Sequence, residues 1–518
     1  MSGPSQPGRS ILLRVLVWIG GLCCALLVLL LLLFSVENGR GQRAWAACQR
    51  ELAVQGEQLD LKAFVPPPIP DDQNFVATPL FAGLNYRSGR GGPGQMDWPS
   101  DYDQAQRQAK KPRQADQRRR GDSTAAFHDL PAWQHAFRIV RTNDADQPIP
   151  VTAPPGATAE MRAALEVLEA LKVYDPPLNE LREAARRPSS RFPVEYEAGN
   201  PMEILLPHLA RLKGICLVLQ LRVAAQLAAG RSDAALDDVL LMLRVTDSVK
   251  DEPILISQLV RNACFQLSAR AINVGLASRK WTEPQLRPLQ ARLQKYDFTA
   301  TAQQALRAER AFGLACLEFI RRGPAPRGQA GNLDDPFEPA QVYRRFLPSG
   351  WLRFEQANYC RALQAMLLPD SDIQQHRINP QLVDQKQAEF EQTPRQPWKV
   401  ILEHRIFTHL LVPALSKTYA KFALAQTVTD QAALACALER YRLANGEFPE
   451  TLEALVPAYI QKVPADVISG EPMRYRRTPD SQFVLWSVAW NDEDEGGVPG
   501  ESVNDTRRGD WVWECPEK

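Results

Sequence analysis

The chain has 518 residues, of which 45% are hydrophobic and 23% are charged, and its formal net charge is +1. This composition is typical of a folded protein with a sizeable core, long enough for two or three domains. The net charge near zero argues against a nucleic-acid partner, because proteins that bind phosphates carry a clear basic excess.

A long apolar segment follows a short N-terminal tail over residues 1–14. The 22 residues from Val15 to Val36 carry no charge. At about 1.5 Å per residue they reach roughly 33 Å, enough to cross a hydrocarbon core of about 30 Å. A cleavable signal peptide has a shorter apolar region that ends at a small-x-small site, and the nearest such site, Ala44-Trp45-Ala46, lies well beyond this segment. We therefore predict one uncleaved transmembrane helix over residues 15–36 and a single-pass membrane protein.

The orientation of this helix is not decided by charge, since Arg residues flank its two ends in nearly equal number. The later cysteines show no paired spacing, which is typical of unpaired thiols in a reducing compartment. They are Cys216, Cys264, Cys316, Cys360 and Cys436.

Residues 37–156 predict a polar helix, a proline-rich stalk and a disordered basic loop. The helix, from Arg43 to Leu59, stops at the proline run that begins at Val65, because proline cannot donate helical hydrogen bonds. Residues 85–123 are rich in Gly, Arg and Gln and predict the loop. Its triplet Arg118 to Arg120 is interpreted as a solvated charge run, with contact to acidic lipids or to nucleic acid as the alternatives.

Residues 157–395 predict an array of α-helices. Apolar residues at steps of three and four form one face of a long helix. This face comprises Leu205, Leu209, Leu212, Cys216, Leu219, Val223 and Leu227. Gly230 is expected to end that helix and Ser232 to cap the next, while Thr282 and Gln285 predict a capping box. The second helix is expected to bury Leu236, Leu240 and Leu243.

The helical hairpin from Val223 to Leu243 weakly resembles a tetratricopeptide repeat, although no 34-residue period recurs. Helical arrays of this kind usually bind other proteins rather than catalyse reactions. After a break at residues 323–339 we expect further helices near residues 340–367 and 380–392. A long helix is then predicted from Trp398 to Ala444, with a kink or break at Pro413.

Residues 396–518 predict this long helix followed by a small α+β module. The helix ends in Tyr441-Arg442-Leu443-Ala444-Asn445-Gly446-Glu447-Phe448-Pro449, where Gly446 can take the left-handed conformation of a C-cap. A short helix over residues 451–456 and a hairpin of two strands, over residues 473–477 and 482–488, follow. An acidic loop over residues 491–497 comes next, and Trp511 and Trp513 are expected to pack a terminal strand on the module.

This order resembles the globular part of the major pseudopilin of type II secretion, over roughly residues 430–497. That family has a helix ending in a Tyr-x-x-x-Asn-Gly-x-Tyr-Pro-like segment, a short helix, a small sheet and an acidic closing loop. The whole chain also resembles large bacterial membrane-anchored proteins with this ending. Here no prepilin cleavage site precedes the apolar segment. The resemblance therefore implies the shape of an extracytoplasmic, protein-binding module rather than a polymerising subunit.

The resemblance also implies a calcium site, because the closing loop of the family can bind this ion. Asn491, Asp492 and Asp494 match the position of that loop and offer hard oxygen ligands. The alternative is an acidic surface loop that binds nothing. No other cofactor is expected.

The search for catalytic residues finds no recognised motif. The histidines are dispersed, and His404 and His409 lie five positions apart, unlike a metal pair at i, i+4. The carboxylate pairs Glu195/Glu197 and Asp237/Asp238 are interpreted as parts of solvated helix faces.

The sequence thus predicts a mainly α protein without enzymatic activity. We expect a scaffold or protein-binding protein of the bacterial inner membrane, linked to a secretion or pilus-like system, with most of the chain outside the cytoplasm. The membrane, through Val15 to Val36, and unidentified proteins are its expected partners. An enzyme with a dispersed active site is the alternative, and a cytoplasmic domain is a weaker one.

Overall fold

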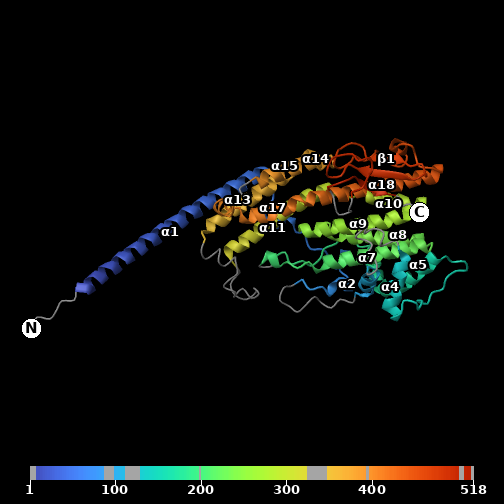
Figure 1. Cartoon of the computed structure of the whole chain (residues 1–518), viewed down its shortest axis with the longest axis horizontal. Helices are drawn as coiled ribbons and strands as arrows, with labels where there is room; N and C mark the ends of the chain where they lie inside the picture. Colours follow the sequence, from blue (N-terminus) through green and yellow to red (C-terminus); the bar gives the residue numbers. More distant parts are fainter. Residues whose placement is uncertain are drawn as a thin grey trace, which may run out of the picture.

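The computed structural model describes residues 7–86, 98–110, 129–197, 200–323, 347–392, 396–500 and 507–514. The fold is mainly helical, as predicted, with one small sheet near the C-terminus. The molecule is elongated. Helix α1 projects from one end, and the sheet lies at the opposite end (Figure 1).

Helix α1 (Pro7–Val54) is a continuous helix of 48 residues. Its apolar part is long and apolar enough to span a membrane, and its side chains make no buried core in the structure. The helix ends at Val54, five residues before the predicted Leu59. The chain turns at Gly56, whose φ of 72° is left-handed. The proline run therefore does not end this helix.

Short helices follow along one flank of the molecule. They are α2 (Pro79–Ala82), α3 (Asp101–Lys110), α4 (Leu130–Thr142), α5 (Ala159–Leu171) and α6 (Asp175–Ala184), with single 3-10 turns at Leu61–Phe64, Asp71–Gln73 and Lys172–Tyr174.

Helix α3 corrects the prediction of a loop over residues 85–123. Tyr102 is 2% exposed, and its backbone N–H donates to the Tyr174 hydroxyl at 2.8 Å. The segment is therefore held by a few buried contacts that its polar composition conceals. Arg118 to Arg120 lie outside the described residues.

The array itself begins with five helices. They are α7 (Pro207–Ala228), α8 (Ser232–Thr246), α9 (Leu255–Ala277), α10 (Glu283–Leu293) and α11 (Phe298–Arg322), with 3-10 turns at Pro201–Glu203 and Asp247–Val249. Helix α7 contacts α5, α8 and α9. By composition the segment Pro201–Ala228 is also apolar enough for a membrane span, but half of its most apolar stretch is buried inside the protein. The predicted apolar face is confirmed from Leu209 onward, while Leu205 precedes the helix and is 39% exposed.

The turn signals in this array are partly confirmed. Gly230 takes φ 74° after α7, and the capping box of Thr282 and Gln285 is present. Ser232 does not cap α8. It is the first residue of that helix, and its hydroxyl instead accepts a hydrogen bond from Gln285. Helix α8 buries Leu243 but leaves Leu240 37% exposed.

Helices α13 (Ser349–Met366) and α15 (Pro380–Glu391) agree with the predicted segments, and the short helix α14 (Asp370–Gln374) between them was not predicted. The single helix predicted from Trp398 to Ala444 is wrong. The structure has α16 (Pro397–Leu402), α17 (Ile406–Ser416) and α18 (Thr418–Asn445) instead. The first break lies at His404, which adopts a left-handed φ of 54°, and the second at Lys417. Pro413 lies inside α17.

The C-terminal module has the predicted order of elements. Helix α18 ends at Gly446 (φ 88°) and is followed by a 3-10 turn, Leu452–Leu455. Strands β1 (Arg474–Arg477), β2 (Phe483–Ser487) and β3 (Trp511–Glu514) form an antiparallel sheet in that order. Arg474 pairs with Trp486, and Trp486 pairs with Val512. The predicted hairpin and terminal strand are confirmed, with Trp511 and Trp513 buried.

The module is not a separate body. Helix α18 contacts α9, α10 and α11 as well as β2 and β3. Arg440 on α18 binds Glu283 and Gln290 of α10, and the Gln290 amide donates to the Tyr459 carbonyl at 2.8 Å. The core therefore continues from the array into the module.

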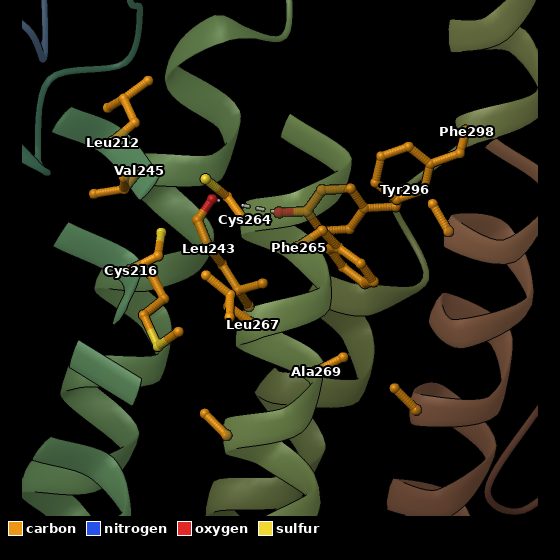
Figure 2. Close-up of a cluster of buried hydrophobic side chains, with 14 of the residues drawn as sticks. Leu212, Cys216, Leu243, Val245, Cys264, Phe265, Leu267, Ala269, Tyr296 and Phe298 are labelled. Carbon is orange, nitrogen blue, oxygen red and sulfur yellow. Dashed lines mark hydrogen bonds between the residues drawn. The ribbon is translucent and has the colours of Figure 1, made fainter. Parts of the chain in front are cut away.

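Aromatic side chains fill the centre of the array. Phe265, Tyr296 and Phe298 pack together, and the Tyr296 hydroxyl donates to the Leu243 carbonyl at 3.3 Å (Figure 2). Arg261 lies over the Tyr296 and Phe298 rings and forms an ion pair with Asp247. A buried cation here has both a carboxylate and ring faces as partners, which offsets its loss of water.

Candidate functional site

The acidic closing loop is the site that the sequence singles out, and its three predicted ligands have three different partners. The Asn491 side-chain amide donates to Glu495 at 2.5 Å, and Asp492 accepts from Gln381 at 3.3 Å. Asp494 accepts from the Trp486 indole N–H at 2.9 Å and from Arg474 at 2.8 Å. These protein donors, with the Trp486 bond first, hold the pKa of Asp494 below its usual value. Each of the three predicted ligands therefore already has a protein partner, and these contacts hold the loop closed.

A carboxylate pair that the sequence did not indicate lies beside this loop. Asp510 is 2% exposed and accepts from the Gly497 backbone N–H at 2.7 Å. Burial, together with the nearby Glu495 carboxyl, raises the pKa of Asp510 to about 6. The buried oxygen Oδ1 of Asp510 and that of Asn491 have no hydrogen-bond partner. Two carboxyl groups and one amide oxygen thus meet at the base of the loop.

Asp466 ties the module together. It is 1% exposed, and its carboxylate accepts from the backbone N–H groups of Ile468 and Val488 and from the Ser487 hydroxyl, at 2.9 to 3.1 Å. Arg474 on β1 also approaches it, at 3.4 Å. Satisfying a buried carboxylate with this many donors fixes the turn against the sheet.

A buried pair of a histidine and a glutamate is the other polar feature that sequence reasoning missed. His208 is 0% exposed and its Nε2 lies 2.9 Å from Glu252, which is 6% exposed. The imidazole stacks on Phe192, with ring centroids 4.1 Å apart, and on Tyr86. The two side chains face the interior of the array, which suits an internal polar contact better than a site open to substrate.

Asp238 corrects the interpretation of Asp237/Asp238 as a solvated pair. Its side chain is 0% exposed and forms ion pairs with Arg182 of α6 and with Arg222 of α7. Arg222 also reaches Asp175 at 2.7 Å. This network joins α6, α7 and α8, and adjacent carboxylates in the sequence do not reveal which of the two is turned inward.

The cysteines are free thiols in the described part of the chain. Cys436 is fully buried, and burial raises the pKa of its thiol to about 12. Two pairs nevertheless come together from distant positions: Cys216 beside Cys264 (Figure 2), and Cys48 beside Cys360. Of the five cysteines predicted to lie in the core, four are buried and Cys316 is half-buried, and their neighbours were not apparent from spacing.

The junction between α1 and the domain is built from α13 and α11. Gly41 of α1 faces Gly350 of α13 so closely that a Cβ atom on Gly41 would lie 2.1 Å from the Gly350 carbonyl oxygen. Farther along, Arg361 approaches Glu51 at 3.3 Å. The residue numbers of the contacting pairs increase along both helices, so α1 and α13 run parallel.

This junction ends in a buried ion group. Glu57 lies 2.6 Å from Arg310 and 3.1 Å from Arg307, both on α11. Arg310 is 1% exposed and also binds Gln364 of α13. Burial alone would raise the pKa of Glu57, but the two guanidinium groups outweigh it and lower the pKa. A buried cation and carboxylate at the end of α1 thus fix this helix to the domain.

Within the described ranges, no three His, Cys, Asp or Glu side chains form a group that would hold a metal ion. Comparison with known protein families, with curated protein sequences and with solved structures gave no match.

Proposed function

We propose that this chain is a single-pass membrane-anchored protein without enzymatic activity, whose rigid helical domain acts as a scaffold for other proteins of the bacterial envelope. The observation that supports it most strongly is the continuity of α1. The same helix carries the exposed apolar run and, beyond it, the residues that pack on α13. Glu57, three residues after the helix ends, binds α11. An anchor built this way holds the domain at a fixed angle and distance from the bilayer.

The partner-binding surface belongs, in this proposal, to the C-terminal module. The sheet lies at the end of the molecule away from α1 (Figure 1). It presents charged side chains, among them Arg477, which pairs with the exposed Glu447 and Glu450. The resemblance of this module to a pseudopilin supports a place outside the cytoplasm and a link to a secretion or pilus-like system.

The membrane and topology parts of the proposal are tested on the full chain. We expect it to stay in the membrane fraction after alkaline extraction, and a variant lacking residues 15–36 to be released. A reporter fused after Lys518 that matures only under oxidising conditions should become active. Release of the intact chain by alkali contradicts the anchor. The orientation is contradicted if this reporter stays inactive while a second reporter, which matures only in the cytoplasm, fluoresces at the same position.

The scaffold part is tested by photo-crosslinking in living cells. A photoreactive amino acid at Glu450, on the module, should give a discrete adduct with one envelope protein that disappears when Arg476 and Arg477 are both changed to Glu. The matched control is the same amino acid at Arg162, an exposed position on α5. Equal adducts at both positions contradict a specific partner surface.

Calcium at the acidic loop stays a separate proposal. The ion would have to draw Asp494 away from Arg474 and Trp486, or use the Asn491, Glu495 and Asp510 oxygens at the base of the loop. Thermal unfolding with calcium, compared with magnesium, tests it. A calcium-specific rise in Tm that Asp510→Asn abolishes supports the ion, and equal curves reject it.

A further inference from the structure

Helices α16 and α17 expose a set of large apolar side chains that the core does not use. We call this set the α16–α17 patch. Its members are Trp398, Ile401, Leu402, Ile406, Leu410 and Leu411. Trp398 is 58% exposed, Leu402 62% and Leu410 70%. A contiguous exposed patch of this kind marks a surface that another phase or molecule covers.

Helix α17 is apolar on both sides. Its inner side buries Val412 against the domain, at 1% exposure, beside the buried Thr408, while Ile406 and Leu410 are exposed on the outer side. A helix in water normally carries polar residues on its outer face, and one that is apolar all round belongs in a core or in lipid. The outer face of α17 therefore has no apolar surroundings in the isolated chain.

The position of the patch identifies what covers it. His404, in the turn between α16 and α17, lies 3.8 Å from Glu37 of α1. Glu37 is the first charged residue after the apolar run that ends at Val36. Beside it, the Asn38 side-chain oxygen accepts from the Gly350 N–H at 2.7 Å. The patch thus starts at the level where α1 would leave a bilayer, and the domain end with α13 and α17 is the end that α1 enters (Figure 1).

The polar residues around the patch fit the boundary between lipid tails and headgroups. Trp398 carries Lys399 over its ring at 5.4 Å, and Arg405 follows in the next turn. Tryptophan favours the membrane interface, and basic side chains nearby favour phosphate groups. A helix that lies in the membrane interface buries its apolar face about 5–10 Å into the boundary between headgroups and acyl chains.

We propose that the α16–α17 patch lies in the membrane interface and forms a second, monotopic contact with the same bilayer that α1 spans. This inference rests on the proposed membrane anchor. Two contacts with one bilayer, the anchor and the patch, would prevent the rigid domain from tilting about α1. The module would then be held away from the membrane surface.

The test measures depth in the bilayer with the full chain in nanodiscs of phosphatidylethanolamine and phosphatidylglycerol. Cys23, Cys24, Cys316 and Cys515 are replaced by Ser, and bimane is attached to Leu402→Cys or Leu410→Cys. Quenching by lipids with a nitroxide near the headgroup is then compared with Val456→Cys, an apolar position of similar type on the module that is 38% exposed. We expect quenching at residues 402 and 410 to exceed that at residue 456 several-fold.

A further labelled protein separates this inference from the anchor. It retains Cys24 in the apolar run as the only labelled thiol, and its quenching by deep nitroxides reports the span itself. Quenching at Cys24 without quenching at residues 402 and 410 overturns the patch alone. No quenching at Cys24 overturns the anchor and the patch with it. If bimane at residue 402 is quenched without nitroxide lipids, and only when the disc holds a second chain, the patch belongs to a dimer interface. That result overturns the lipid contact.

Discussion

Helix α13 has two neighbours that are joined to it by opposite means. Helix α1 packs through facing glycines, and the turn after it carries Glu57, which has two guanidinium partners. Helix α17 is held instead by Glu355 of α13, a side chain that is 0% exposed and accepts hydrogen bonds from the N-terminal backbone N–H groups of α17. The first contact uses a paired charge, and the second uses a buried carboxyl that accepts hydrogen bonds from neutral groups. The contact of α1 with the domain should therefore be strong and insensitive to pH near neutrality. The contact of α17 with α13 should weaken as pH rises.

Glu57→Gln should have the largest effect, because it leaves the Arg310 guanidinium buried without its carboxylate. Breaking a buried pair in this way costs about 3–5 kcal/mol. We expect that loss in the free energy of unfolding, measured by urea titration of the full chain in detergent. Glu51→Gln, in the last turns of α1, is the matched control, since the Glu51 and Arg361 side chains are 53% and 45% exposed. It should cost less than about 1 kcal/mol. Equal losses contradict the difference in burial.

Glu355→Gln should remove a pH dependence. Burial raises the pKa of Glu355 from 4.5 to about 7, although hydrogen bonds from Ile406, Phe407 and Thr408 oppose the shift. The folded state therefore binds this proton more tightly than the unfolded state does. The stabilisation is fully present below about pH 4.5 and is lost as pH rises through about 7, with a total of at most about 3 kcal/mol.

Hydrogen exchange of the α17 amides at pH 5.5 and pH 8, corrected for intrinsic rates, measures this effect. The wild-type chain should lose protection at the higher pH, and Glu355→Gln should retain it. Glu403→Gln changes an exposed carboxylate in the neighbouring turn and should behave like the wild type. A wild-type loss of protection that survives in Glu355→Gln assigns the pH dependence to another group.

The features that the sequence predicted correctly are determined within a few residues. Gly446 ends α18, Thr282 and Gln285 form their capping box, and the β1–β2 hairpin has the expected turn. Each depends on a local preference for a backbone conformation or a short-range hydrogen bond. The long apolar run of α1 belongs to the same class, because its length and composition alone define it.

The features that were missed depend on partners far apart in the sequence. Glu57 and Arg310 are separated by 253 positions. Nothing near Asp238 distinguishes it from the adjacent Asp237 before α6 and α7 are in place. In the acidic loop the sequence indicated side chains with oxygen ligands, but Arg474 and Trp486 bind Asp494, and Asp510 comes from the residue before β3. The break at His404 was missed because its cause, the anchoring of α17 by Glu355, is also tertiary.

Apart from the controls, Gly41→Ala should have the smallest effect of the destabilising substitutions, because it adds a single methyl group to the contact between α1 and α13. The added Cβ would lie 2.1 Å from a backbone oxygen of Gly350, which cannot turn aside as a flexible side chain would. We expect a loss of about 1–3 kcal/mol, the usual cost of overpacking. Gly39→Ala is the matched control two residues earlier, where the nearest atom is the end of the Arg43 side chain at 3.8 Å. Because alanine favours a helix over glycine by about 1 kcal/mol, that variant should be slightly stabilised. Opposite signs for these two substitutions in urea titrations would place the closest approach of the two helices at Gly41. Equal signs would mean that α1 contacts α13 through a different face.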